Sequence, residues 1–203
     1  MLLSASNFAA LGATTLVNSG TSDMQGQVGV SPGTSIRGFP PGRLTGVLHS
    51  NDSAATQAQA DAHAGYATLA NMTSNTTLTG QNLGSMILTP GVYHFVSSAT
   101  LSGRLTFDAL NDTSAVFVIQ IGTVFTTAAT SEVLLVNGAQ SCNIFFQVGT
   151  SATLGASSSL SGTIVAHDSI SAGANAIVHG SLLALGAAVS TDTNIIQPPG
   201  ACI

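Results

Sequence analysis

The run His167-Asp168-Ser169 contains the residue types of a nucleophilic catalytic triad. A working triad needs a histidine that contacts the hydroxyl and a carboxylate that contacts the histidine. Adjacent residues on a strand point to opposite faces of a sheet, so these three side chains would not form that relay. We therefore expect no catalytic residues in this run.

The other titratable residues also lack the spacing of a reactive site. Eight acidic residues are scattered along the chain, whereas a solenoid hydrolase needs clustered carboxylates. The five histidines have no metal-ligand spacing relative to one another. They are His49, His63, His94, His167 and His179. We predict that the protein is not an enzyme and that it holds neither a metal nor a cofactor.

A more regular array of polar groups follows a three-residue pattern. In five short segments, one Ser or Thr lies between two residues that are mostly apolar or small and would point inward. These central residues, the hydroxyl ladder, are Thr100, Thr126, Thr153, Ser171 and Ser190. Further hydroxyl residues expected on the same surface are Ser98, Ser151, Ser169 and Thr15. Stacked strands would place all of them on one flat face, with Asp192 as a charge at its edge.

Two interpretations of this face are open. Thr and Ser suit exposed strands in any sheet, so the ladder could have no function. An exposed β face normally carries some Lys or Glu, however, and such charges also limit aggregation. A large uncharged face therefore favours a partner that is flat, repetitive and uncharged. Candidates are ice, a crystalline polysaccharide or another copy of the chain.

The elements that must position these hydroxyls recur along the sequence. Residues 160–166 match residues 178–184 after a displacement of eighteen positions. Related apolar segments occur at 143–149, 116–122 and 92–96, and a second apolar patch follows each of them. Self-similarity at this period, built from short β segments and Gly, Ser and Asn turns, indicates a solenoid. We predict a mostly β fold of about six stacked coils, forming a single domain over residues 1–203.

One Ala-rich stretch departs from the β pattern and predicts a long helix at about 52–71. Its apolar stripe has a spacing of three to four residues and consists of Ala55, Ala58, Ala62, Tyr66 and Leu69. About 20 residues at a 1.5 Å rise give roughly 30 Å, the height of about six coils. We expect an N-terminal coil at about 4–48, a helix along the full stack, and coils at about 88–197 that wind back beside the first.

Composition limits the partners and the compartment. Charged residues make up 5% of the chain, there is no lysine, and the net charge is −5. Because the chain has so few basic residues, we expect it to bind neither nucleic acid nor an anionic membrane surface. No run of about 18 apolar residues predicts a membrane span. The start lacks the basic and apolar regions of a signal peptide, so we expect a mature chain whose signal has been removed, or a cytosolic protein.

The two cysteines leave two alternatives. Cys142 and Cys202 are either buried free thiols or the partners of one disulfide that ties the C-terminal tail to the coils. We favour the disulfide. It would close a long loop and stabilise the fold by about 4 kcal/mol in the chain-entropy model.

Several blocks, taken in order, resemble the microbial ice-binding (antifreeze) protein family. They are residues 5–9, 28–32, 89–93, 116–120, 137–140, 146–149 and 162–166. The resemblance implies an irregular right-handed β-solenoid of triangular cross-section with one helix packed along a side. It also implies secretion, no cofactor, and adsorption to an ice crystal surface through one flat face. The family has no strictly repeated ice-binding motif, so the ladder depends on the local pattern alone. We expect a monomer, and the alternative function is an extracellular adhesion or structural module that binds glycan or a like chain.

Overall fold

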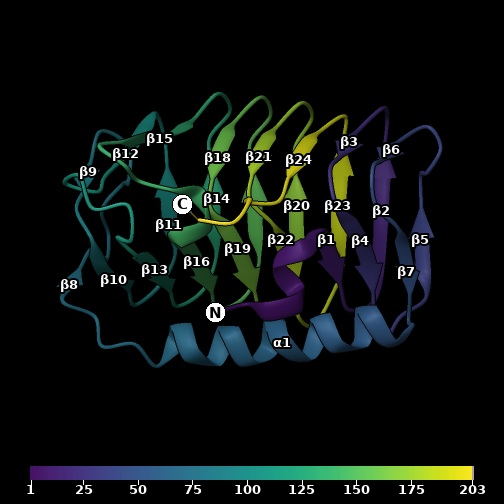
Figure 1. Cartoon of the computed structure of the whole chain (residues 1–203). Coiled ribbons are helices and arrows are strands. Elements are labelled where there is room, and N and C mark those ends of the chain that lie inside the picture. Colours follow the sequence, from purple (N-terminus) through teal and green to yellow (C-terminus); the bar gives the residue numbers. More distant parts are fainter. Residues whose placement is uncertain (203) are drawn as a thin grey trace.

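The computed structural model describes residues 1–202, which wind into a β-solenoid with one long helix along its side (Figure 1). Three parallel sheets of nine, seven and eight strands form the three sides of the coil stack. We name them sheets A, B and C. The mostly β solenoid with a single long helix that the sequence predicts is therefore confirmed.

Each complete coil contributes one strand to each sheet. Sheet A contains β1 (Phe8–Gly12), β4 (Gln27–Val30), β7 (Leu48–Ser50), β8 (Thr76–Thr77), β10 (Gly91–Phe95), β13 (Phe117–Ile121), β16 (Ile144–Val148), β19 (Thr163–Ala166) and β22 (Leu182–Ala184). Sheet B contains β2 (Thr15–Ser19), β5 (Ser35–Arg37), β11 (Ala99–Leu101), β14 (Phe125–Thr127), β17 (Ala152–Leu154), β20 (Ile170–Ala172) and β23 (Val189–Asp192). Sheet C contains β3 (Asp23–Met24), β6 (Arg43–Leu44), β9 (Ile87–Leu88), β12 (Arg104–Asp108), β15 (Glu132–Val136), β18 (Ser159–Ser161), β21 (Ile177–His179) and β24 (Ile195–Gln197).

The helices connect and flank the coils. The long helix α1 (Ser53–Ala70) follows β7 at one end of the stack and leads to β8 at the other end. The later coils then wind back until β22, β23 and β24 pair with β1, β2 and β3. This confirms the expected path of the chain. Of two short 3-10 helices, η1 (Leu3–Asn7) precedes the first coil and η2 (Ser141–Asn143) lies at the corner between β15 and β16.

The number of coils differs from the prediction. The segment at about 4–48 was expected to form one coil, but it forms two, β1 to β3 and β4 to β6. Ala10 pairs with Val28, eighteen residues later, so these coils have the common period. Strands β3, β5 and β6 are only two or three residues long and carry polar side chains, so their pattern was too weak to separate the coils. The seven strands of sheet B therefore mark seven complete coils where about six were expected.

An apolar core fills the inside of the three sheets. Its largest members are phenylalanines that are fully buried, and their rings contact one another through the stack. Phe125 stacks on Phe146 with ring centroids 5.1 Å apart, and Phe107 lies 4.9 Å from Phe117. Close-packed aromatic layers resist deformation, so the core holds the sheets rigid.

Glycines at the corner between sheets A and B let successive coils stack closely. A Cβ atom added at Gly149 would lie 2.1 Å from the carbonyl oxygen of Gly122. A Cβ added at Gly122 would lie 2.2 Å from the carbonyl oxygen of Val96 in the coil before it. Any side chain at these positions would push the coils apart, which is why Gly follows these two sheet A strands.

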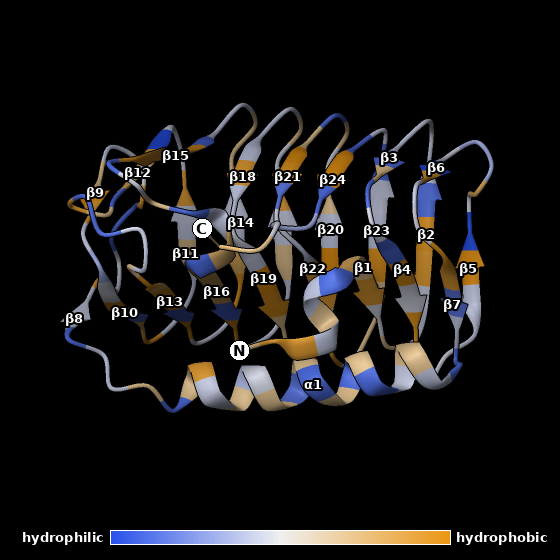
Figure 2. Cartoon of the chain, in the orientation of Figure 1, coloured by the Kyte–Doolittle hydropathy of each residue, from blue (hydrophilic) through white to orange (hydrophobic). Residues whose placement is uncertain are grey.

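A second apolar cluster lies between sheet A and α1. Ala58, Ala62 and Leu69 of the helix belong to this buried cluster together with Phe145 and Val165 of the sheet. The strands of sheet A beside the helix, among them β13, β19 and β1, are largely hydrophobic in colour in Figure 2. Residues on both faces of these strands are buried because one face lines the core and the other carries the helix.

Polar contacts fix the helix at both ends and in the middle. The Asp52 carboxylate accepts a 2.9 Å hydrogen bond from the Ala55 amide and caps the N-terminus. The side-chain amide of Gln120 donates to the carbonyls of Leu69 and Met72, at 2.8 Å each. Gln59 donates to the Ala184 carbonyl at 3.1 Å. Among residues 1–202, no helix combines the length and the apolar character needed to cross a membrane.

Candidate functional site

The five residues of the hydroxyl ladder lie side by side on sheet B, in register. Thr100 pairs with Thr126, and Thr126 pairs with Thr153. Thr153 pairs in turn with Ser171, and Ser171 with Ser190. All five side chains are exposed. The sequence pattern thus identified one continuous row of hydroxyls across five consecutive coils.

Alternation along each strand is what exposes the ladder. In β17 the ladder residue Thr153 is exposed, whereas Ala152 and Leu154 on either side are each 1% exposed. The same buried-exposed-buried pattern occurs in β11, β14, β20 and at the start of β23. Successive side chains of a strand point to opposite faces, so apolar neighbours turned into the core force the hydroxyls outward.

Two of the inward neighbours are themselves threonines, and both have hydrogen-bond partners. The Thr127 hydroxyl accepts a 2.9 Å bond from the Gly155 amide of the next coil. The Thr191 hydroxyl donates to the side-chain oxygen of Asn18 at 3.0 Å. Both hydroxyls are therefore satisfied inside the fold, and they do not contribute to the exposed face.

A second row of mostly small residues runs beside the ladder, two positions earlier in each coil. Ser98, Ser151 and Ser169 belong to it, and the hydroxyls of Ser151 and Ser169 are 3.0 Å apart. Thr15 also lies in this row, where it pairs with Ser35 of β5. Val124 and Ala188 interrupt the row, so the hydroxyls are less regular here than in the ladder. The four additional residues expected on this surface are thus on it, in the flanking row.

Sequence reasoning missed how the ladder continues. Ser190 pairs with Val17, and Val17 pairs with Arg37 at the edge of the sheet. At the other end, Asn82 forms a parallel bridge to Thr100. The sequence signal for this extension was weak, because the exposed Val17 lies between Leu16 and Asn18, which are both buried, and a polar Asn does not predict an inward position. It was obscured when the two N-terminal coils were treated as one.

The two other sides of the solenoid are chemically different from sheet B. Sheet A is partly covered by α1, as described above. The outer surface of sheet C carries paired charges, since Arg104 Nε lies 2.8 Å from Glu132 Oε2. Arg43 and Asp23 also lie on sheet C, in neighbouring strands. Sheet B carries charge only near its edges among the described residues, at Arg37 and Asp192, and its middle is a broad neutral face.

The structure shows why the His167-Asp168-Ser169 run makes no triad. These residues lie in the turn between β19 and β20, and not on a strand as the sequence argument assumed. His167 Nδ1 contacts Asp168 Oδ1 at 2.8 Å, but the Ser169 hydroxyl contacts Ser151. Within residues 1–202, no three His, Cys, Asp or Glu side chains come together as a possible metal site.

The carboxylates with shifted pKa values are held by structural hydrogen bonds away from the ladder. The Ala55 amide, followed by the His49 side chain, lowers the pKa of Asp52 at the start of α1. The Ser4 hydroxyl is the main cause of a lowered pKa at Asp61, which joins η1 to the helix. These shifts stabilise the charged forms and indicate structural roles, not catalysis.

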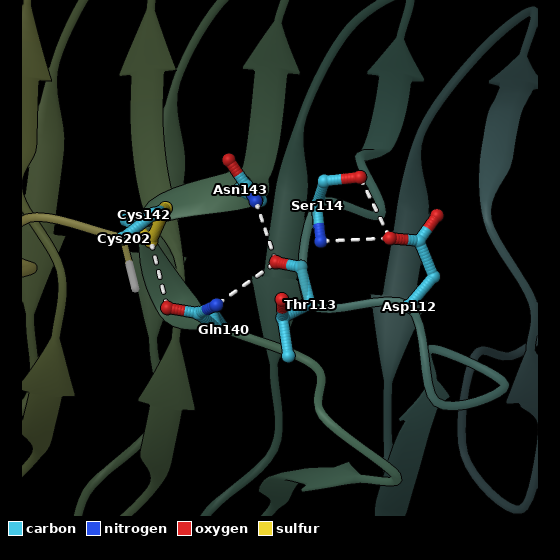
Figure 3. Close-up of a disulfide and its surroundings, with 7 residues drawn as sticks. All are labelled: Asp112, Thr113, Ser114, Gln140, Cys142, Asn143 and Cys202. Atoms are coloured by element: carbon cyan, nitrogen blue, oxygen red, sulfur yellow. Dashed lines mark hydrogen bonds between the residues drawn. A yellow bond between two sulfur atoms is a disulfide. The ribbon is translucent and has the colours of Figure 1, made fainter.

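The structure joins Cys142 and Cys202 in a disulfide, the second of the two alternatives (Figure 3). Their Cα atoms are 5.9 Å apart. The bond ties the tail that follows β24 to η2, at the corner between sheets C and A. Nearby, the side-chain amide of Gln140 donates to the Thr113 carbonyl at 2.8 Å. The disulfide therefore lies away from sheet B.

Comparison with known proteins shows which family the chain belongs to. Residues 10–197 match the model of the ice-binding-like family. The chain belongs to this family. An ice-binding protein of Nostoc sp. (strain HG1) is 47% identical over 199 residues, which cover 97% of this chain and 73% of the relative. The family and the fold that the sequence blocks predict are thereby confirmed.

Solved structures of this ice-binding family have the same architecture. The crystal structure of an ice-binding protein from the Antarctic ascomycete Antarctomyces psychrotrophicus has a TM-score of 0.96 and 40% sequence identity. The match covers 99% of this chain and 98% of that chain. An ice-binding protein from an Antarctic biological consortium also has a TM-score of 0.96, with 43% identity, over 98% of this chain and 91% of that chain.

Proposed function

We propose that this member of the ice-binding family adsorbs to ice crystals through sheet B and thereby inhibits ice growth and recrystallisation. The observation that carries the proposal is the hydroxyl ladder. It presents one exposed hydroxyl per coil over five consecutive coils on a face without charge in its middle. The names of the relatives support the same activity.

The mechanism needs no charge and no catalytic group. Each Thr of the ladder presents a methyl and a hydroxyl, and the row repeats at the strand spacing of about 4.8 Å. Water between these groups is ordered by hydrogen bonds to the hydroxyls and by the apolar methyls beside them. A water layer that fits the ice lattice joins the protein to the crystal. The ice front must then curve between adsorbed molecules, and growth stops locally.

Rigidity of the face is what makes a fixed water layer possible. The ladder stands on strands whose inward residues are packed in the core, such as Phe125 beside Thr126. Phe125 in turn stacks on Phe146 of the neighbouring coil. A surface that is already ordered loses little conformational entropy on binding, so more of the contact energy is retained as affinity.

The direct test is to observe a single ice crystal in a dilute solution of the protein just below the melting point. Faceting of the crystal and a gap between melting and freezing temperatures are the expected results. A round disc that grows freely would contradict the proposal. It would favour the alternative, an adhesion or structural module that binds glycan or a like chain through the same face.

We further propose that the protein is a secreted monomer without catalytic activity. The Cys142–Cys202 disulfide supports an extracellular location, because disulfides persist in oxidising compartments. Gel filtration with light scattering tests the monomer. Elemental analysis after purification without added metal tests the absence of a tightly bound metal, and stoichiometric zinc would contradict it.

A further inference from the structure

We propose that Arg37 ends the ice-adsorbing surface at the N-terminal side of the stack. This inference depends on the proposed function, since it concerns the extent of the same face. The contact would include Val17 and stop one coil short of the edge of sheet B. Arg37 would then determine the width of the surface, and so the strength of adsorption.

The register of sheet B places Arg37 in line with the ladder. Ser190 pairs with Val17 in β23 and β2, and Val17 pairs with Arg37 in β2 and β5. Arg37 is exposed, as are the five ladder residues and Val17. Strand β5 is also the last strand of sheet B on this side. The row of outward side chains therefore changes from small and neutral to long and cationic at its final position.

The chemistry of a guanidinium is unsuited to an ordered water layer on this face. It carries five N–H donors and no acceptor, and its charge holds its own hydration shell. Arg104 on sheet C has its charge paired with Glu132. Within residues 1–202, Arg37 has no such ion pair. The side chain is also much longer than that of Thr or Val, so the side chains of the row no longer have similar lengths at this position.

The size of the effect follows from the strand spacing. Six in-line positions, from Thr100 to Val17, span five intervals or about 24 Å at about 4.8 Å each. A neutral residue at position 37 would add one interval, which lengthens the row by about a fifth. The edge residues of β5 are otherwise compatible with contact, because Ser35 belongs to the flanking hydroxyl row.

Substitution of Arg37 by Thr tests the inference. We expect Arg37→Thr to increase thermal hysteresis above that of the wild type at equal concentration, and Arg37→Lys to leave it unchanged. The matched control is Arg43→Thr, which removes the same charge from the same coil but on sheet C. Thermal unfolding of each variant checks that the fold is intact, which we expect because both arginines are exposed.

The results for these variants separate this inference from the proposed function. A rise in Arg37→Thr alone supports the boundary. Equal hysteresis in Arg37→Thr and the wild type, or an equal rise in Arg43→Thr, overturns it. A Thr153→Tyr variant measured alongside reports on the face itself. If it loses activity while Arg37→Thr gains none, only the boundary is wrong; if it keeps full activity, the choice of sheet B is wrong.

Discussion

Substitution of Ala62 by Arg tests how α1 is attached to the coils. Ala62 is 0% exposed and belongs to the apolar cluster between the helix and sheet A, with Phe145 and Val165. A long cationic side chain has no space at this contact and no partner for its charge. The helix must shift, or the guanidinium must be buried without compensation.

The expected loss of folding stability in Ala62→Arg can be estimated from the burial of Ala62. Overpacking of a close contact costs about 1–3 kcal/mol, and the displaced charge brings the total to about 3 kcal/mol or more. For a chain of this length, each kcal/mol lowers the Tm by about 2–4 °C, so we expect a decrease of about 6–12 °C. The matched control is Ala60→Arg on the same helix, because Ala60 is exposed and has room for the side chain.

Thermal unfolding followed by circular dichroism measures the difference. The wild type and Ala60→Arg should have Tm values within about 2 °C of each other, since exposed substitutions change stability by about 0.5 kcal/mol or less. If Ala62→Arg unfolds at the same temperature as Ala60→Arg, the helix is not docked through its Ala stripe, and our account of sheet A as covered on both faces is wrong.

Three further predictions concern contacts that hold the fold. Gln120→Leu should lower the Tm, because it removes the hydrogen bonds that this side chain donates to the carbonyls of Leu69 and Met72, at a cost of about 1–3 kcal/mol; calorimetry that shows no change would contradict this. Asp52 has a lowered pKa in the folded state, so its stabilisation is present above its ordinary value of 3.8 and is lost as the pH falls below it. The Tm of the wild type should therefore decrease more on acidification through this range than that of Asp52→Asn, and equal decreases would contradict the assignment. Cys142→Ser should destabilise the fold by about 4 kcal/mol, because the bond closes a loop with a sequence separation of 60, whereas ice shaping should persist at temperatures where the variant stays folded.

The fold could be predicted well where the sequence repeats. The coils that contain Leu160 and Val178 have apolar strands in sheet A, short turns and an even spacing, and the structure pairs these two residues. The helix was equally clear, because an Ala-rich run with one apolar stripe interrupts a β pattern. The N-terminal coils were not resolved. Strands β3, β5 and β6 are short and carry polar side chains, and the first coil pairs with strands more than 150 residues later in the chain, among them β23 and β24.

The candidate ice-binding face was likewise predictable in one part and not in another. The ladder from Thr100 to Ser190 could be read directly, because each hydroxyl lies between residues that must point inward. Its ends could not, since Val17, Arg37 and Asn82 join it only through pairing between distant segments. A local pattern identifies which side of a strand is exposed, but three-dimensional register decides which strands are neighbours.

The most direct test of the central claim compares a bulky substitution in the middle of the ladder with one on the adjacent side. Thr153 is exposed on β17 of sheet B as the middle residue of the ladder, and His179 is exposed on β21 of sheet C. Thr153→Tyr should keep the fold, because exposed substitutions usually change stability by about 0.5 kcal/mol or less. A flat rigid face cannot close around a protruding ring.

Thermal hysteresis of the two folded variants, measured at equal concentration, decides the question. We predict that Thr153→Tyr loses most of the activity of the wild type and that His179→Tyr keeps it. If Thr153→Tyr retains full freezing-point depression while His179→Tyr loses it, ice binds to a different side of the solenoid.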